Sequence, residues 1–404
     1  MSYRSLPWLI AVIMSSLLLT ACLDSGSSNN NDSEDSPSPG DDPVNTSSVN
    51  GVVRNYFTGE PISDATVTIT NSNQGTVTEG QTNQEGRFEL DADQGLTRIS
   101  VNASADGFGD MSEIASTEES SDSEGIEISL LPSNLETSFD PSVENSLSVD
   151  GVDVIDLNAD SFVSEDGSTY TDSVDSEVTI IDPTSDPDVM PGGYEAQSSE
   201  GEEGLMESWG AMTATFEGQN GEDVQLGQGE TATIRIPLAE GRTPSNSPSS
   251  IPLFFFDQEA GIWREEGSAT LRTESGEAFY EGEVSHFTTW NADSLYDSVN
   301  VSGRVVNESG EPVRNATVTA EGQSYIGSSN TRTAEDGTFT IEVRPDSDFL
   351  IAASRASQSN TRSVSIGNED IELETDIVLT EASVAVTLSW GEEPRDLDSH
   401  LFGP

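Results

Sequence analysis

The sequence contains no lysine. All 15 basic residues among its 404 are arginine, against 74 acidic residues, which gives a formal net charge of −59. Such a surface repels nucleic acid and anionic lipid headgroups, so neither is expected as a partner. A phosphate-binding P-loop is excluded because it requires a lysine. Self-repulsion on this scale destabilises a compact fold unless salt screens it. We therefore predict a halophilic or marine bacterial source.

Cysteine and histidine are almost as scarce. Cys22 is the only cysteine, so no disulfide can form within the chain and stability must come from hydrophobic cores. The two histidines are His286 and His400, and there is neither a Gly-x-Ser-x-Gly elbow nor a His-Glu-x-x-His pair. A carboxylate pair for glycoside hydrolysis stays open, but nothing singles one out among the many acids. We expect a protein without catalytic activity and without a cofactor.

The amino terminus has the features of a targeting segment. Arg4 precedes an apolar run, Trp8–Leu19, that is too short to span a bilayer and has the length of a secretory signal. The run ends in the letters LTAC at Cys22, which resembles the lipobox of bacterial lipoproteins. The resemblance implies a signal peptide over residues 1–21, lipidation of Cys22 and anchoring by two or more acyl chains. Leu23, where an Asp would favour the inner membrane, implies an outer-membrane lipoprotein on the periplasmic or cell-surface side. The alternative is a soluble secreted protein.

The segment after the cysteine is polar. Residues 24–48 contain one apolar side chain, Val44, and so cannot bury a core. We predict that residues 22–48 form a disordered acidic tether. A coil of this length has a typical reach of about 30 Å, which would lift the first domain off the membrane.

An internal repeat follows the tether. Gly59-Glu60-Pro61 recurs at a constant offset as Gly310-Glu311-Pro312, and the Ala-Thr-Val-Thr that follows each triplet recurs with it. Both copies alternate as strands do, and each has an acidic residue and a glycine where a tight turn needs positive φ. Phe88 and Phe339 are expected to return to the core after these turns.

This pattern resembles the carboxypeptidase regulatory-like domain, a small transthyretin-like β-sandwich. The resemblance covers residues 49–132 and 298–381. Modules of this family accompany some carboxypeptidases but have no zinc site and no protease chemistry. The resemblance therefore implies two non-catalytic β-sandwiches.

The segment between the copies, residues 133–297, is also β-rich. Ala232, Ile234, Ile236 and Leu238 alternate with polar residues, which predicts a half-buried strand. Hairpins are predicted around Ala260-Gly261 and Ser275-Gly276. Pieces of this segment are similar to a domain of extracellular proteins that include the cartilage intermediate layer protein. The predicted fold class is therefore all-β, with tandem small β-sandwiches (prealbumin or immunoglobulin-like) flanking a larger β domain after a disordered tether. Residues 382–404 are predicted to start a further, truncated β domain.

One triplet suggests self-cleavage. His286-Phe287-Thr288 resembles the His-hydrophobic-Ser/Thr step of self-cleaving domains in some surface receptors and nucleoporins. By that resemblance Thr288 would attack the preceding carbonyl, His286 would take its proton, and the Phe287–Thr288 bond would be cut. The alternative is an ordinary core strand whose shared face is formed by Val284, His286, Thr288 and Trp290.

Metal binding has weak support. Asp396, Asp398 and His400 alternate along one predicted strand and could hold a divalent ion, although an exposed strand face explains them equally well. The spacing of Asp156, Asn158 and Asp160 is that of a calcium loop, but Ser161 replaces the required glycine. Weak Ca²⁺ binding by acidic loops such as 182–188 stays open.

These patterns predict a lipid-anchored cell-envelope protein with a structural, adhesive or ligand-presenting role. Its partners would be the membrane, through the anchor, and an envelope or extracellular protein or glycan. The first alternative is a glycan- or peptide-binding module that uses Trp209, Trp263 or Trp290, although these side chains also suit a core. The second is an autoproteolytic surface domain cut at Phe287–Thr288.

Overall fold

The computed structural model describes residues 46–73, 75–117, 125–164, 166–184, 186–355 and 358–381, all within one compact unit, Val44–Pro404. The predicted signal peptide, Cys22, nearly all of the predicted tether and residues 382–404 lie outside the described residues. The first strand begins at Thr46, three residues before the predicted start of the first sandwich.

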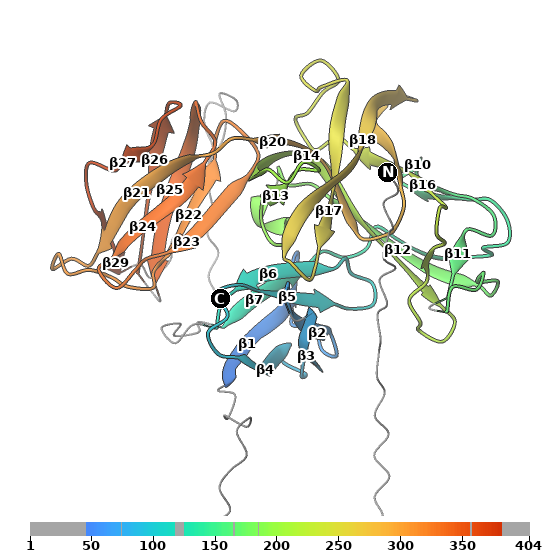
Figure 1. Ribbon diagram of the computed structural model, residues 1–404, viewed down its shortest axis with the longest axis horizontal. Coiled ribbons are helices and arrows are strands. Elements are labelled where there is room, and N and C mark those ends of the chain that lie inside the picture. Colours follow the sequence, from blue (N-terminus) through green and yellow to red (C-terminus); the bar gives the residue numbers. More distant parts are fainter. Residues whose placement is uncertain are drawn as a thin grey trace, which may run out of the picture. The chain divides into compact units, whose positions relative to one another are not determined.

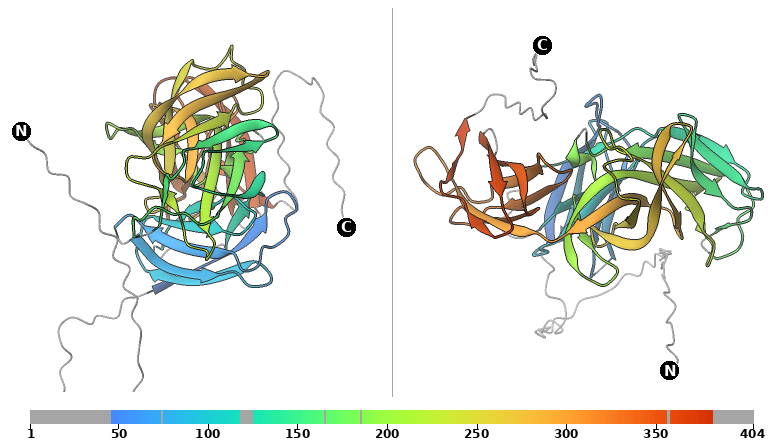
Figure 2. Two further views of the ribbon diagram at one scale, coloured as in Figure 1. Left: turned by 90° about the vertical axis from the view of Figure 1, so that its right-hand side faces the viewer. Right: turned by 90° about the horizontal axis from the view of Figure 1, so that it is seen from above.

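The described residues form β-strands joined by turns, with a single short 3-10 helix, Pro187–Val189. The prediction of an all-β fold is confirmed. Within the described residues there is no helix of the length and apolarity needed to cross a membrane. The strands can be followed in Figures 1 and 2.

The first module, blue to cyan in Figure 1, packs two sheets face to face. One sheet has the order β4-β1-β7 and consists of Arg87–Asp93, Thr46–Asn55 and Ile126–Leu130. The other has the order β3-β2-β5-β6 and consists of Gly75–Gln81, Thr66–Asn71, Ile99–Ser104 and Met111–Ala115. Alternate apolar residues of the facing strands form one core, which includes Val53, Val67, Ile69, Phe88, Val101 and Ile128.

The second module, orange to red, repeats this plan. Its smaller sheet contains β21, β24, β27 and β28, which span Val299–Val306, Thr338–Val343, Ile371–Glu372 and Ile377–Val378. Its larger sheet has the order β23-β22-β25-β26-β29 and spans Ser328–Arg332, Thr317–Gly322, Ser347–Arg355, Gln358–Ile366 and Thr380–Glu381. As in the first module, the strand that opens the smaller sheet pairs parallel with a late strand.

The repeated glycines adopt the predicted turn conformation. Gly86 has φ +70° and Gly337 has φ +79°. A Cβ atom on Gly337 would lie 2.5 Å from the carbonyl oxygen of Val305, and one on Gly86 would lie 2.5 Å from that of Val53. Glycine is therefore required in both copies by conformation and by close backbone approach. Phe88 and Phe339 are buried, as predicted.

The middle domain is one eleven-stranded sheet with the order β8-β12-β14-β20-β17-β18-β19-β16-β10-β9, to which β13 adds at β14 and β18; β11 and β15 pair separately. Its strands are β8 Leu135–Phe139, β9 Asn145–Val149, β10 Val152–Leu157, β11 Phe162–Val163, β12 Val174–Ile181, β13 Glu195–Gln197, β14 Glu203–Gly218, β15 Gln225–Leu226, β16 Ala232–Pro237, β17 Ser250–Asp257, β18 Ile262–Glu274, β19 Glu277–Val284 and β20 Thr289–Tyr296.

The long sheet curls onto itself. Phe139 on β8 and Leu147 on β9 come from its two ends, yet both belong to one core cluster. A twisted sheet with this many strands buries its apolar face by curling. The predicted strand at 232–238 and the two predicted hairpins, β17–β18 and β18–β19, are confirmed.

One local expectation is wrong. No single strand runs from Val284 to Trp290, because β19 ends at Val284, residues 285–288 are irregular and β20 begins at Thr289. The alternating residues span a crossover between strands that are not neighbours, since β17 and β18 separate β20 from β19 in the sheet.

Candidate functional site

The first module contacts the middle domain through the turn between β17 and β18. The Thr70 hydroxyl donates to the carbonyl oxygen of Gln258 at 2.6 Å, and Arg98 Nη2 donates to that of Gly261 at 2.6 Å. Arg98 Nη1 also pairs with Glu195 at 2.7 Å. We call this contact region the first joint.

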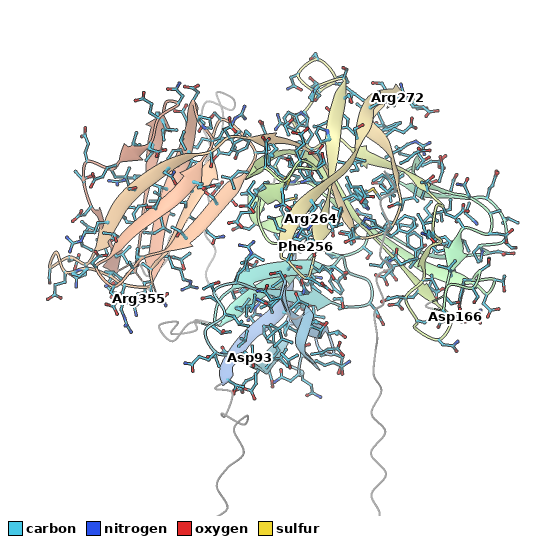
Figure 3. The ribbon with its side chains drawn as sticks, in the orientation of Figure 1. Asp93, Asp166, Phe256, Arg264, Arg272 and Arg355 are labelled. Carbon is cyan, nitrogen blue, oxygen red and sulfur yellow. The ribbon has the colours of Figure 1, made fainter. Side chains whose placement is uncertain are left out.

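The turn itself is braced. Asp257 accepts backbone hydrogen bonds from Glu259 and Ala260, and its Oδ2 lies 2.6 Å from Arg264 Nε. Figure 3 shows Arg264 and Phe256 near this end of the hairpin. Phe256 packs against Trp263 with ring centroids 5.3 Å apart. The end of the braced β17–β18 hairpin therefore contacts the first module at the first joint.

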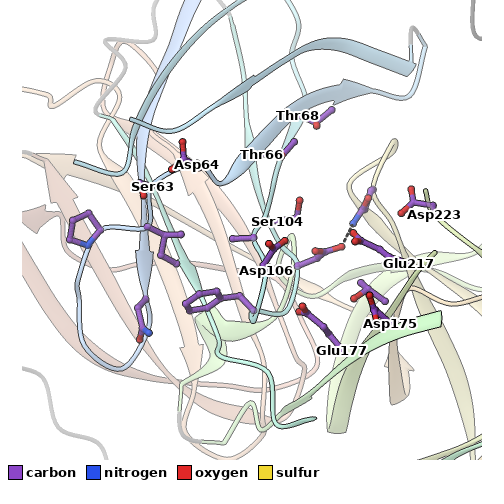
Figure 4. A pocket seen from close by; sticks show the side chains of 18 of the residues that line it. Ser63, Asp64, Thr66, Thr68, Ser104, Asp106, Asp175, Glu177, Glu217 and Asp223 are labelled. Atoms are coloured by element: carbon purple, nitrogen blue, oxygen red, sulfur yellow. Dashed lines mark hydrogen bonds between the residues drawn. The ribbon is translucent and has the colours of Figure 1, made fainter. Parts of the chain in front are cut away.

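Beside the turn lies a groove of about 780 Å³, which Figure 4 shows from close by. We call it the acidic groove. Eight carboxylates line it: Glu60, Asp64, Asp106, Asp110, Asp175, Glu177, Glu217 and Asp223. Among the described residues, no basic side chain lines it.

Strand alternation explains how the acids reach the groove. On β12 the buried residues Val174, Ser176 and Val178 alternate with Asp175 and Glu177, which point away from the core. Two groove carboxylates bridge the two domains. Glu177 accepts the backbone N–H of Gly107 at 3.0 Å, and Asp110 accepts from Gln258 Nε2 at 3.4 Å.

The environment of the groove raises the pKa values of three of its carboxyl groups. The pKa of Asp110 is raised to about 6, chiefly by burial; the hydrogen bond from Gln258 lowers it, and the charges of Asp223, Glu177 and Glu217 raise it. Burial and then the charge of Asp223 raise the pKa of Glu217. Burial also raises the pKa of Glu177. At neutral pH the groove attracts cations and repels anions. Its carboxylates do not converge as metal ligands do, and the part of the chain that the structure describes has no cluster suited to a metal ion.

One carboxylate forms ion pairs both within the middle domain and with the second module. Glu207 on β14 is 7% exposed. Its Oε1 lies 2.8 Å from Arg242 Nη2 in the middle domain, and its Oε2 pairs with Arg344 Nη1 in the second module. Arg344 also lies over the rings of Tyr296 and Tyr325, at 5.6 and 5.7 Å from their centroids. We call this contact region the second joint.

A buried polar network lies behind Glu207. Asp293 is 0% exposed and accepts from Asn291 Nδ2 at 2.5 Å, while Ser208 Oγ donates to Asn291 Oδ1 at 2.9 Å. Burial raises the pKa of Asp293 well above its usual range, and the charge of Glu207 raises it further. The sequence offered no sign of this network, because Asn and Asp more often mark turns than strand interiors.

The predicted self-cleavage residues have other partners. The Thr288 hydroxyl donates to the carbonyl oxygen of Phe256 at 3.3 Å. The His286 ring packs against Phe255 and Trp290, with centroids 4.8 and 5.0 Å away, and its Nε2 lies 3.8 Å from Glu266 Oε2. Burial lowers the pKa of His286, against the charge of Glu266. The imidazole and the hydroxyl that the reaction would pair are thus directed to different groups.

The three tryptophans proposed for ligand stacking are in the interior. Trp209, Trp263 and Trp290 are 8%, 0% and 1% exposed. Trp263 Nε1 donates to the carbonyl oxygen of Gly193 at 2.9 Å, and Trp290 Nε1 to that of His286 at 3.1 Å. Their role is to fill the core, and the prediction of an exposed stacking surface made of them is wrong.

The remaining predicted site residues form two groups: those outside the described residues and those whose side chains have other partners. Cys22, Asp396, Asp398 and His400 lie outside the described residues. In the calcium-like spacing, Asp156 Oδ2 pairs with Arg235 at 2.7 Å. Asn158, its neighbour in that spacing, donates to the Thr231 carbonyl oxygen at 3.0 Å.

Comparison with protein families identifies the repeated unit. The model of the carboxypeptidase regulatory-like domain matches residues 48–130 and 300–387. These matches confirm the resemblance that the repeat suggested. No curated protein is significantly similar to the chain.

Solved structures with some similarity include two major pilins and a third bacterial protein. The Bacillus anthracis TIE protein is 11% identical with a TM-score of 0.18, over 83% of this chain and 51% of that one. A point variant of BcpA, the major pilin subunit of Bacillus cereus, is 8% identical with a TM-score of 0.19, over 83% and 100%. The major pilin SpaD of Corynebacterium diphtheriae is 10% identical with a TM-score of 0.18, over 83% and 98%. Identities and scores this low carry no functional information.

Proposed function

We propose that the protein is a structural or adhesive component of a bacterial cell envelope, without catalytic activity, that is attached to the outer membrane through lipidated Cys22. The observation that carries this proposal is the construction of the two joints. Each joins a β-sandwich module to the middle domain through specific, partly buried polar contacts, at Thr70 and Arg98 in one case and at Glu207 in the other.

Polar contacts of this kind favour one relative arrangement of domains. Interfaces between domains of one chain are by default small and mobile. A charge pair buried at such an interface fixes its register, because separating the partners leaves a charge unpaired. An array whose domains keep a defined arrangement at a given pH and salt concentration can hold its loops at a set distance from the membrane, which suits a scaffold or an adhesin.

Two further observations support a non-catalytic role. The repeat matches the model of a family that the resemblance describes as accessory modules without protease chemistry. In addition, the side chains proposed for chemistry or stacking are occupied by packing, as at His286, Thr288 and Trp263.

The anchor and the location can be tested in cells. Metabolic labelling with an alkyne fatty acid should label the wild-type chain, and the chain should sediment with outer membranes. The Cys22→Ser variant should lose the label and move to the soluble fraction. An unlabelled wild-type chain in the soluble fraction would refute the anchor.

The role itself needs a separate measurement. Cells that display the anchored chain should attach to surfaces or to one another more strongly than cells with the Cys22→Ser variant at equal expression. Equal attachment, together with equal resistance of the envelope to detergent, would refute a structural or adhesive function.

A further inference from the structure

The walls of the acidic groove belong to two different domains. The first module supplies Glu60, Asp64, Asp106 and Asp110, and the middle domain supplies Asp175, Glu177, Glu217 and Asp223. The charged side chains that line the groove with Asp110 are the other seven carboxylates, and its amide side chains are Asn55 and Gln258, of which Gln258 donates to Asp110. Charges of one sign therefore face each other across the first joint.

The same joint also has attractive contacts. At the β17–β18 turn, Thr70 binds Gln258 and Arg98 binds Gly261 and Glu195. The connecting chain adds a backbone bond of 2.8 Å from the Gly109 N–H to the Leu131 carbonyl oxygen. The first joint thus combines attractive contacts at the β17–β18 turn with like charges that repel one another across the groove. A joint of this kind can act as a hinge.

We propose that the first joint is an electrostatic hinge, in which the two walls of the acidic groove separate when their carboxylates are ionised and unscreened, and approach when protons or salt neutralise them. The β17–β18 turn is the pivot. This inference does not depend on the anchor, and it limits the fixed arrangement of the proposed function to conditions in which the first joint is closed.

The direction of the pH response follows from linkage. In the closed groove, burial and neighbouring charges raise the pKa of Asp110 to about 6, and they also raise the pKa values of Glu177 and Glu217. In an opened groove these carboxyls regain water and their pKa values fall towards the usual range for acids. The closed state therefore binds protons more tightly. Its stabilisation is fully present at acidic pH and is lost as the pH rises through about 6.

Salt acts on the same repulsion. The Debye length falls from about 10 Å at 0.1 M to about 3 Å at 1 M salt, so charges on opposite walls cease to interact over this range. The hinge should therefore close at high salt even at pH 8, where protonation contributes little.

The distance across the groove can be measured with spin labels. Cys22→Ser removes the native thiol, and Ser63→Cys and Asn220→Cys place exposed labels on the first module and the middle domain. Double electron–electron resonance should show a longer mean distance at pH 8 in about 0.1 M salt. The distance should shorten with a midpoint near pH 6, and it should shorten at pH 8 in about 1 M salt.

Two triple variants with the same change in net charge provide the control. Asp110→Asn with Glu217→Gln and Asp223→Asn removes three of the groove's eight carboxylates, and should shorten the distance at pH 8 in low salt and weaken the response to pH and salt. Glu308→Gln with Glu335→Gln and Glu369→Gln removes three exposed charges from the second module, and should keep the full response.

The possible results of these measurements either support the hinge or overturn it. A distance that is constant across pH and salt overturns the hinge, and so does an equal loss of response in both triple variants. Should the groove variant fail to fold, the single exposed change Asp223→Asn still tests the idea, because it must lower the midpoint pH by removing the neighbour that most raises the pKa of Asp110.

Discussion

Glu207 and Arg344 form an ion pair between the middle domain and the second module, although they lie 137 positions apart in the chain. The other oxygen of Glu207 binds Arg242. One largely buried carboxylate therefore pairs with two guanidinium groups from two domains, and removing it would take this ion-pair partner from both.

The first prediction concerns this pair. Glu207→Ala should lower the free energy of unfolding by about 3–5 kcal/mol, because it leaves buried charge without a partner. Arg344 is the more exposed partner, so Arg344→Ala should cost less. Chemical denaturation monitored by tryptophan fluorescence would measure both. The exposed change Glu308→Gln in the second module serves as control and should be neutral. A loss below about 1 kcal/mol for Glu207→Ala would contradict the role given to the second joint.

The second prediction separates backbone conformation from steric contact at a turn. Gly310 and Gly337 both have φ +79°, but a Cβ on Gly310 meets nothing within 4 Å, whereas one on Gly337 lies 2.5 Å from the Val305 carbonyl oxygen. Gly310→Ala should cost about 1–2 kcal/mol, the usual penalty for left-handed backbone. Gly337→Ala should cost a further 1–3 kcal/mol or so for overpacking. Equal losses in thermal unfolding would show that the close approach at Gly337 is unimportant.

The third prediction follows from the net charge. The melting temperature should rise steeply with NaCl from about 0.1 M to about 1 M, because the Debye length falls from about 10 to about 3 Å over that range. KCl at the same ionic strength should give the same rise, since screening does not depend on the cation. Differential scanning calorimetry would measure it, and a flat response to both salts would rule out a halophilic design of the surface.

The fourth prediction addresses self-cleavage. Purified protein should run as one full-length band on a denaturing gel, because the Thr288 hydroxyl is directed to Phe256 and the His286 ring is held between Phe255 and Trp290. The Thr288→Ala variant should look the same. Two fragments, one of which begins at Thr288 and disappears in the variant, would establish the autoproteolytic alternative.

Local patterns predicted the parts of the fold that depend on local chemistry. The strand at Ala232–Pro237 follows from period-two alternation, and the turns at Gly86 and Gly337 follow from the need for positive φ. The repeat strengthened the prediction of two sandwich modules, because two copies with the same spacing of turns and apolar residues are hard to obtain by chance. For these reasons the sandwich modules could be predicted.

The joints could not be predicted in this way. Arg242 and Arg344 both bind Glu207, yet any of 15 arginines could in principle have paired with any of 74 acids. The acidic groove likewise gathers residues from Glu60 to Asp223 that come together only after two domains pack. The break at 285–288 was missed for a related reason, since alternation continued by coincidence across the connection between β19 and β20.

The position of strand β14 affects how the protein would respond to a pulling force on its two modules. It contains Glu207 of the second joint near one end and Glu217 of the acidic groove near the other. At about 3.3 Å per residue these positions are roughly 30 Å apart along one extended backbone. Tension between the two modules would reach the middle domain at Glu207 on β14 and at the β17–β18 turn, so it would load the hydrogen bonds of β20, which lies between β14 and β17 in the sheet.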